Sequence, residues 1–144
     1  MKCELVEDLS RLAESILEEI PYAVIYADDT GTIKRWNQAA AALFGYSAAQ
    51  ALDQKLDLII PEHLRAAHWR GFEAAMTNGV MTLQGRPTLT RATHQSGRKL
   101  YVEITFALVK GQDEGASRGA VAVARDVTER IEQQRADARR DSPG

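Results

Sequence analysis

The segment KLYVEITFALVKG, residues 99–111, constrains the fold of this chain more than any other feature. Apolar residues recur in it at every second position, which is the period of a β-strand with one buried face. That face must be covered by other parts of the chain, because it is apolar throughout. It carries Leu100, Val102, Ile104, Phe106 and Leu108.

Four more strands are predicted around this one. A strand within residues 80–94 precedes it, and the turn QSGR joins the two, with Gly97 supplying a flexible backbone. Nearer the N-terminus, YAVIYA and TIKRW flank the turn signal DDTG and predict a hairpin. AVAVARDV predicts the fifth strand. The order of the segments favours a single antiparallel sheet of five strands.

Helical patterns fill the stretch between the second and third strands. Asn37 is expected to cap the helix QAAAALFGY, which stops at Gly45. Ser47 opens another short helix, and a longer one is predicted from about Glu62 to Thr77. These helices are the natural cover for the apolar sheet face, so we predict an α+β fold with helices packed on one face. The space between sheet and helices suits either a filled core or a ligand.

The two ends of the chain are predicted to be helices outside the sheet. Residues 4–20 have apolar residues at helical spacing and end before Pro21. This narrow apolar stripe would dock on the domain or on a second copy of itself. We therefore divide the chain into an N-terminal flanking helix at 1–20, a central domain at 21–127, and a C-terminal helix and tail at 128–144.

Composition excludes several classes of protein. The net charge of −2 gives no reason to expect nucleic-acid binding, and no apolar run reaches the ~18 residues of a membrane span. The first residues are acidic, unlike a signal peptide, so we expect a cytoplasmic protein. The single cysteine, Cys3, excludes an internal disulfide and a cysteine-based zinc site. No nucleophile elbow, P-loop or carboxylate pair is present, so we expect no enzyme activity.

Three segments together resemble a PAS domain. IPYAVIYADDTGTIKRWNQAAAALFGYSAAQALDQKLDLIIPEHLR is similar to its first half, and HQSGRKLYVEITF to its later strand pair. GAVAVARDVTERIEQQ is similar to its last strand and the start of its signalling helix. The resemblance covers about residues 20 to 132. It implies a sensor and dimerisation module whose ligand is haem, a flavin, another small molecule or none, so the fold does not settle the function.

PEHLRAAH is similar to the helix of haem-binding PAS domains in oxygen-sensing kinases and phosphodiesterases. On that register His68 is the proximal ligand to the iron of haem b, a role for which neutral imidazole is suited. Leu83, Ile104 and Phe106 fall where the family places apolar residues over the gas-binding side. The resemblance thus implies a sensor of O2, CO, NO or redox state. It would relay its signal through a homodimer of the flanking helices to an output kinase or cyclase, as in two-component systems.

The register also departs from that family. The distal arginine falls on Thr88, while Arg86 lies two residues earlier, on the same face of the expected strand. Our hypothesis is that Arg86 supplies the distal hydrogen bond or a propionate contact. The positions of the family's propionate partners on the helix hold Ala74 and Ala75, which cannot bind a carboxylate through their side chains.

Two alternatives to haem stay open. A lone histidine on a helix is most often a surface or hydrogen-bonded residue, so the domain would then bind another small ligand or serve only in dimerisation. Flavin-adduct chemistry and covalent chromophores require a pocket cysteine, which this chain lacks beyond Cys3. A flavin held without a covalent bond is not excluded by the sequence.

Overall fold

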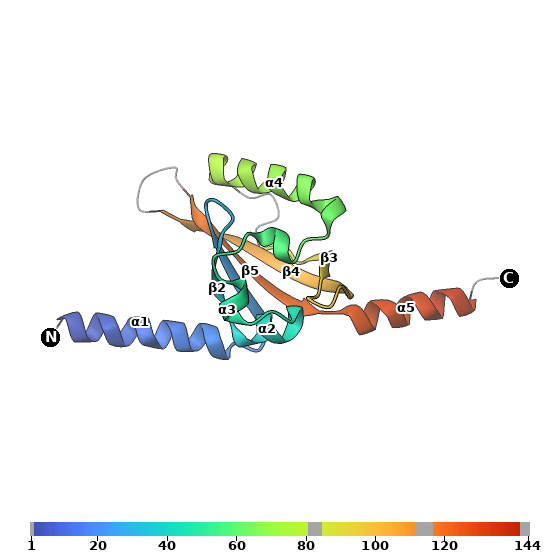
Figure 1. The fold of residues 1–144 in the computed structure, drawn as a ribbon, viewed down its shortest axis with the longest axis horizontal. Helices are drawn as coiled ribbons and strands as arrows, with labels where there is room; N and C mark the ends of the chain where they lie inside the picture. Colours follow the sequence, from blue (N-terminus) through green and yellow to red (C-terminus); the bar gives the residue numbers. More distant parts are fainter. Residues whose placement is uncertain (1, 81–84, 112–116, 142–144) are drawn as a thin grey trace.

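The predicted strands form one five-stranded antiparallel sheet in a computed structural model, which describes residues 2–80, 85–111 and 117–141. The strand order is β2-β1-β5-β4-β3, so the first and last strands of the chain lie side by side in the middle (Figure 1). This confirms the predicted fold class. The strands are β1 (Ala23–Asp28), β2 (Ile33–Trp36), β3 (Thr88–Thr93), β4 (Lys99–Lys110) and β5 (Ser117–Asp126).

The apolar face of β4 continues across β5. Ile104 lies opposite Ala124, and Phe106 lies opposite Ala122, so small side chains on β5 stand beside large ones on β4. Ile25 of β1 extends the same row from Ala122. These residues share one face because side chains alternate along a strand. The largest fully buried side chains of the core are Phe44, Ile33, Leu100 and Val102.

The segment between β2 and β3 covers this core face, as predicted (Figure 1). Its short helix after Ser47 is one turn long, because Leu52 adopts an extended backbone. The expected helix from Glu62 begins with a 3₁₀ turn and becomes α-helical at Arg65. The elements are α2 (Gln38–Phe44), α3 (Ala48–Ala51), η1 (Leu56–Leu58), η2 (Glu62–Leu64) and α4 (Arg65–Asn78).

Asn37 joins three elements at the base of the domain. Its side-chain oxygen accepts hydrogen bonds from the backbone N–H groups of Val24, at 2.9 Å, and Ala40, at 3.0 Å. Its amide nitrogen donates to the carbonyls of Leu17, at 2.8 Å, and Tyr22, at 3.0 Å. The helix cap predicted from the sequence therefore also ties the N-terminal helix to β1 and α2.

The terminal helices α1 (Lys2–Glu19) and α5 (Thr128–Asp141) project from opposite ends of the domain (Figure 1). The C-terminal part of α1 is fastened to the domain through Asn37 and an ion pair of 2.9 Å between Glu14 and Arg35. The rest of α1 extends away from the sheet, so its apolar residues remain exposed.

The third strand begins later than the sequence suggested. We expected Arg86 within this strand, but β3 starts at Thr88. Pro87 has no N–H for a strand ladder, and Gly85 adopts a left-handed backbone with φ of +74°. Arg86 consequently precedes the strand, and its side chain is exposed. Leu83 lies outside the described residues.

Candidate functional site

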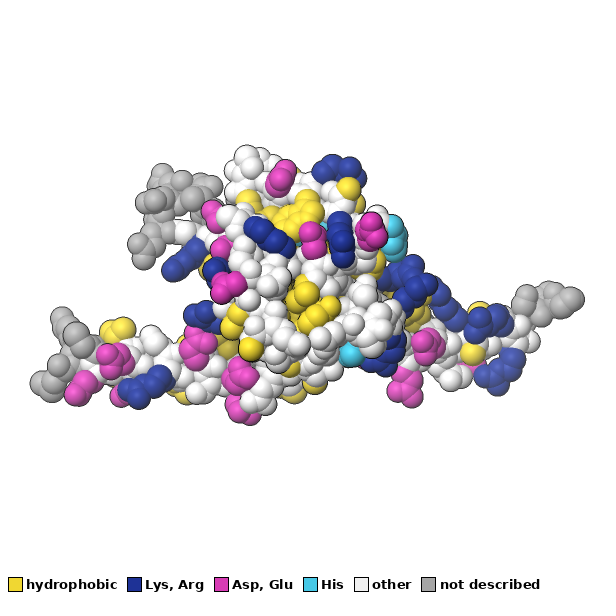
Figure 2. Space-filling view, viewed as in Figure 1, with side chains coloured by type: hydrophobic (Ala, Val, Ile, Leu, Met, Phe, Trp, Pro, Cys, Tyr) yellow, Lys and Arg dark blue, Asp and Glu magenta, His cyan; other side chains and the backbone are white. Residues whose placement is uncertain are grey.

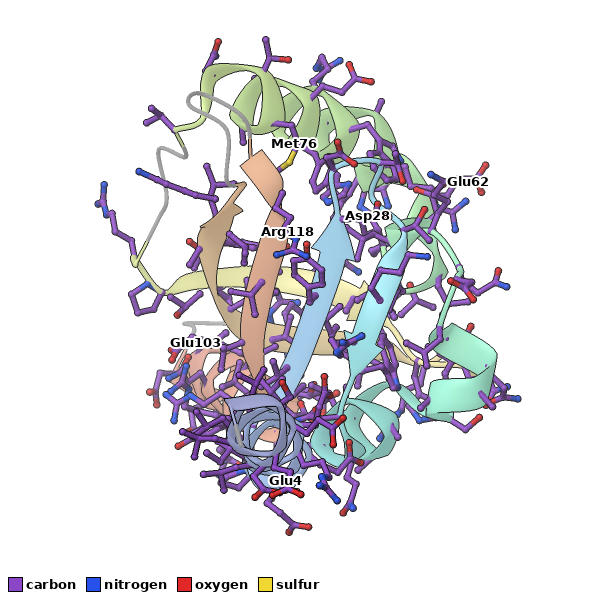
Figure 3. The ribbon with its side chains drawn as sticks, turned by 90° about the vertical axis from the view of Figure 1, so that its left-hand side faces the viewer. Glu4, Asp28, Glu62, Met76, Glu103 and Arg118 are labelled. Atoms are coloured by element: carbon purple, nitrogen blue, oxygen red, sulfur yellow. The ribbon has the colours of Figure 1, made fainter. Side chains whose placement is uncertain are left out.

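Helix α4 is fixed over the sheet by Trp69. The indole N–H donates a 2.7 Å hydrogen bond to Oδ1 of Asp57 in η1. The indole ring also lies on the backbone of Gly31, in the turn between β1 and β2, where an added Cβ would stand 2.3 Å from the ring. Figure 3 shows this turn, beyond the labelled Asp28, reaching up to α4. Trp69 therefore packs against the domain.

His68 lies on the sheet-facing side of α4. It shares that side with the buried Phe72 and Ala75, which follow four and seven residues later on the helix. The His68 ring centroid lies 5.9 Å from that of Phe72 and 4.9 Å from that of Trp69. Met76 also points from α4 towards the strands (Figure 3). The imidazole is thus held among aromatic rings on the side of α4 that faces the sheet.

The Nδ1 atom of His68 is buried and has no hydrogen-bond partner. Among the described residues it is the one buried side-chain nitrogen or oxygen in that condition. Buried polar groups are nearly always paired, so an unpaired ring nitrogen needs a physical explanation. A ligand that binds the imidazole, or one whose binding turns the ring towards a hydrogen-bond partner, would provide that explanation.

Burial lowers the pKa of His68 below its ordinary value, although the carboxylate of Asp57 acts in the opposite direction. Desolvation disfavours the charged imidazolium more than the neutral ring. His68 is therefore neutral at pH 7, which is the protonation state that a metal ion requires of a histidine ligand.

Three of the candidate residues predicted on the sheet side of the site lie on the core face of the sheet. Ile104 is buried, Phe106 is half-buried, and Thr88 stands directly opposite Ile104 in the β3–β4 ladder. The N–H of Gly85 donates a 3.1 Å hydrogen bond to the carbonyl of Phe106, so the chain before β3 stays beside β4. The structure thus assembles Thr88, Ile104 and Phe106 on one face but leaves Arg86 exposed to solvent.

Sequence reasoning missed two open cavities at the base of the domain. One, of about 390 Å³, lies between α1, β2 and α3 and includes Glu14, Leu17 and Trp36 in its lining. The other, of about 480 Å³, lies between α2 and β5 and includes Tyr22 and Leu43. Each joins residues from elements far apart in the sequence, which no local sequence pattern encodes.

Two further observations concern metal clusters and membrane spans. Within residues 2–80, 85–111 and 117–141, no three His, Cys, Asp or Glu side chains gather closely enough to hold a metal ion. No described helix is long and apolar enough to cross a membrane.

A model of the family described as "PAS domain" matches residues 21–129. The chain belongs to the PAS domain family. Among solved structures, the PAS domain of a protein from Colwellia psychrerythraea superimposes with a TM-score of 0.71 at 21% identity, covering 84% of this chain and 98% of that one. The PAS fold is therefore shared with that domain. As a member of the PAS family, the chain is a sensory module.

Two curated relatives are similar in sequence. An uncharacterised protein of Azorhizobium caulinodans is 31% identical over 133 residues, which is 92% of this chain and 17% of that protein. The sensor protein FixL of Bradyrhizobium diazoefficiens is 41% identical over 54 residues, which is 38% of this chain and 11% of FixL. The chain thus spans less than a fifth of either relative.

Proposed function

We propose that this PAS domain binds haem b through His68 and senses a diatomic gas or redox state. The observation that carries the proposal is the neutral, partly buried imidazole, whose Nδ1 is unpaired on the sheet-facing side of α4. The similarity of one segment of the chain to the sensor protein FixL supports it. Bound haem would supply an iron that takes up the gas and changes its spin state.

The residues of the chain have separate roles in this proposal. His68 would hold the iron from the helix side, while Ile104 and Phe106 would exclude water from the sheet side. Thr88, whose hydroxyl donates to the Arg86 carbonyl at 3.3 Å, would offer a polar group near the gas. Arg86 is exposed, so we assign to it a contact with a propionate at the rim or a distal hydrogen bond. Leu83 is the remaining apolar candidate.

The signal would leave the site through β4, β5 and α5. Tyr101 of β4 accepts a 2.9 Å hydrogen bond from the N–H of Val127, and its own N–H donates to Oγ1 of Thr128. A shift of β4 would therefore move the start of α5 directly. We propose that α1 and α5 act in a homodimer that controls an output kinase or cyclase, and that the chain itself catalyses nothing.

The visible spectrum of the purified protein, with and without added haemin, tests the haem site. We expect one haem per chain and an intense Soret band in the wild type, with loss or a shift of that band in His68→Ala. His63→Ala is the matched control, because His63 is exposed in η2 and should leave the band unchanged. In His68→Gly, added imidazole should restore the wild-type band by replacing the missing ligand.

Two results of this experiment would contradict the proposed haem site. A protein that takes up no stoichiometric haemin excludes the haem site and leaves a PAS module for another ligand or for dimerisation. Equal bands in the wild type and His68→Ala would show that haem binds, but not through His68. If haem binds through His68, the rate at which carbon monoxide dissociates from Thr88→Ala and from Arg86→Ala, each compared with the wild type, shows which of the two side chains contacts the bound gas.

A further inference from the structure

Two arginines from different elements approach one aromatic ring. The guanidinium carbon of Arg91, in β3, lies 5.8 Å from the centroid of the Tyr101 ring, and that of Arg135, in α5, lies 4.9 Å from the same centroid. The electron-rich face of an aromatic ring attracts each of these cations. Two positive charges that are far apart in the sequence are therefore held within one small region.

Regular elements of the fold set this arrangement. Arg91 stands directly opposite Tyr101 in the β3–β4 ladder. The start of α5 is bonded to the same residue, because the Tyr101 N–H donates a 2.9 Å hydrogen bond to Oγ1 of Thr128. Arg135 follows the buried Ile131 by four residues, which places it on the side of α5 that faces the sheet. Both guanidinium groups thus project from elements that are fixed to Tyr101.

Lys99 adds a third positive charge to this region. It precedes Tyr101 by two residues in β4, so the two side chains lie on the same face of the sheet. The side chains of Lys99 and Arg135 are exposed, whereas that of Arg91 is half-buried. We call Arg91, Lys99 and Arg135 the basic cluster. Figure 2 shows basic side chains gathered where the domain meets α5.

No carboxylate within residues 2–80, 85–111 and 117–141 forms an ion pair with a member of the basic cluster. Glu103 lies on the same face of β4, but it contacts Arg125 at 3.0 Å and lies 3.8 Å from Arg130. The basic cluster therefore combines like charges that repel one another. An anion placed among them would convert this repulsion into attraction.

We propose that the basic cluster binds a phosphoryl group, carried by inorganic phosphate or by a small phosphorylated metabolite. Guanidinium groups offer N–H donors in a planar fork that matches the oxygens of phosphate. A group with two negative charges and several oxygens can accept hydrogen bonds from Arg91 and Arg135 together, with Lys99 beside it. A chloride ion has one charge and no such oxygens, so it meets neither requirement.

A bound phosphoryl group would join the sheet to the output helix. Arg91 belongs to β3 and Arg135 to α5, so an anion that both contact draws α5 towards the sheet. A signal from the core face also reaches α5 through the backbone of Tyr101. The basic cluster would thus give α5 a second input at the same residue. It lies on the sheet face opposite to α4, so this input is independent of the haem site.

Thermal unfolding and hydrogen exchange in matched salts test this site. The full chain is compared in phosphate and in chloride at equal pH and equal ionic strength, since chloride reproduces screening but supplies no phosphoryl group. We expect a saturable rise in Tm and slower amide exchange along α5 in phosphate alone, because a ligand stabilises the state that binds it. Equal values in the two salts would overturn the proposal.

Single substitutions identify the side chains that bind phosphate. Arg91→Gln and Arg135→Gln should each raise the dissociation constant for phosphate about tenfold or more, because hydrogen bonds to a charged group are lost. Arg135→Lys keeps the charge but loses the planar fork, so it should weaken binding less. Arg70→Gln, at an exposed position of α4, is the matched control for the loss of one positive charge. Wild-type phosphate affinity in both Arg91→Gln and Arg135→Gln would place any bound phosphate elsewhere and overturn the proposal.

Two further probes distinguish the sources of the phosphoryl group. Adenosine monophosphate is compared with inorganic phosphate, and adenosine is the control that lacks the phosphoryl group. Equal affinities for the two phosphate compounds, both reduced in Arg91→Gln, would support a site for phosphate itself. Tighter binding of adenosine monophosphate would support a phosphorylated metabolite. If adenosine binds as tightly as its monophosphate, the phosphoryl group is not what the site recognises, and the proposal is wrong.

Discussion

The indole N–H of Trp69 lies 2.7 Å from Oδ1 of Asp57, and this hydrogen bond fixes α4 to the segment that precedes it. The same indole ring covers Gly31, so one side chain joins α4 to both η1 and the β1–β2 turn. Because His68 is the neighbouring residue on α4, the placement of Trp69 also sets the placement of the candidate ligand.

Gly31→Ala should destabilise the domain through two separable effects. Gly31 has φ of +79°, and a left-handed backbone alone costs a non-glycine residue about 1–2 kcal/mol. The added Cβ would also overlap the Trp69 ring. Urea denaturation should therefore show a larger loss for Gly31→Ala in the wild type than in a Trp69→Ala background, where only the backbone cost remains. Equal losses in both backgrounds would show that the ring yields freely.

Asn37→Ala should cost about 2–4 kcal/mol, since removing a buried side chain that makes five hydrogen bonds leaves several backbone groups unpaired. Asn37→Asp keeps the acceptor for Val24 and Ala40 but loses the donor, so it should also destabilise the domain. Gln38→Ala, at an exposed neighbour, is the control and should change the free energy of unfolding by less than about 0.5 kcal/mol. Thermal and urea unfolding measure all three.

The sequence predicted the fold well because its signals are local. The alternation from Leu100 to Leu108, the cap at Asn37 and the stop at Gly45 each act within a few residues. The late start of β3 also had a local cause in Pro87. Pro87 interrupts the period of two that had suggested a continuous strand including Arg86.

The candidate site was only partly predictable. The sequence pointed to His68 by resemblance, but nothing in it showed that Trp69 would bond to Asp57 or lie on Gly31. Those contacts join residues 12 and 38 positions apart, and they depend on how α4 crosses the sheet. The four hydrogen bonds of Asn37 beyond its helix cap could not be predicted for the same reason.

The stability of the haem-free protein should fall as the pH drops below about 6.5, through His68. In the unfolded chain this histidine has its ordinary pKa of 6.5, and burial lowers that pKa in the folded chain. Between the two values the unfolded state binds more protons, so the free energy of unfolding rises with pH and decreases on acidification. Below the folded pKa the loss levels off.

Comparing the free energy of unfolding of the wild type with that of His68→Gln isolates the contribution of His68 to this pH dependence. Urea denaturation across pH 5 to 8 should show a weaker pH dependence in His68→Gln than in the wild type. His63→Gln, at an exposed position of η2, is the matched control. A pH dependence unchanged by His68→Gln would mean that the folded and unfolded states hold this proton equally well.

The attachment of α5 should loosen when Thr128 loses its hydroxyl. Oγ1 of Thr128 accepts a 2.9 Å hydrogen bond from the N–H of Tyr101, and the Thr128 N–H donates to Asp126. Thr128→Val keeps the shape but leaves the Tyr101 N–H unpaired, which costs about 1–3 kcal/mol. Hydrogen exchange should become faster along α5 and at Tyr101 while the amides of α4 stay unchanged.

Tyr101→Leu should loosen the same helix by a different route, because it removes the ring that faces Arg135 at 4.9 Å. Gln134→Ala, at an exposed position of α5, is the control for both variants and should leave exchange as in the wild type. If α5 exchanges at the wild-type rate in both Thr128→Val and Tyr101→Leu, its attachment lies elsewhere. A change in β4 at the candidate site would then have no direct path to α5 through Tyr101.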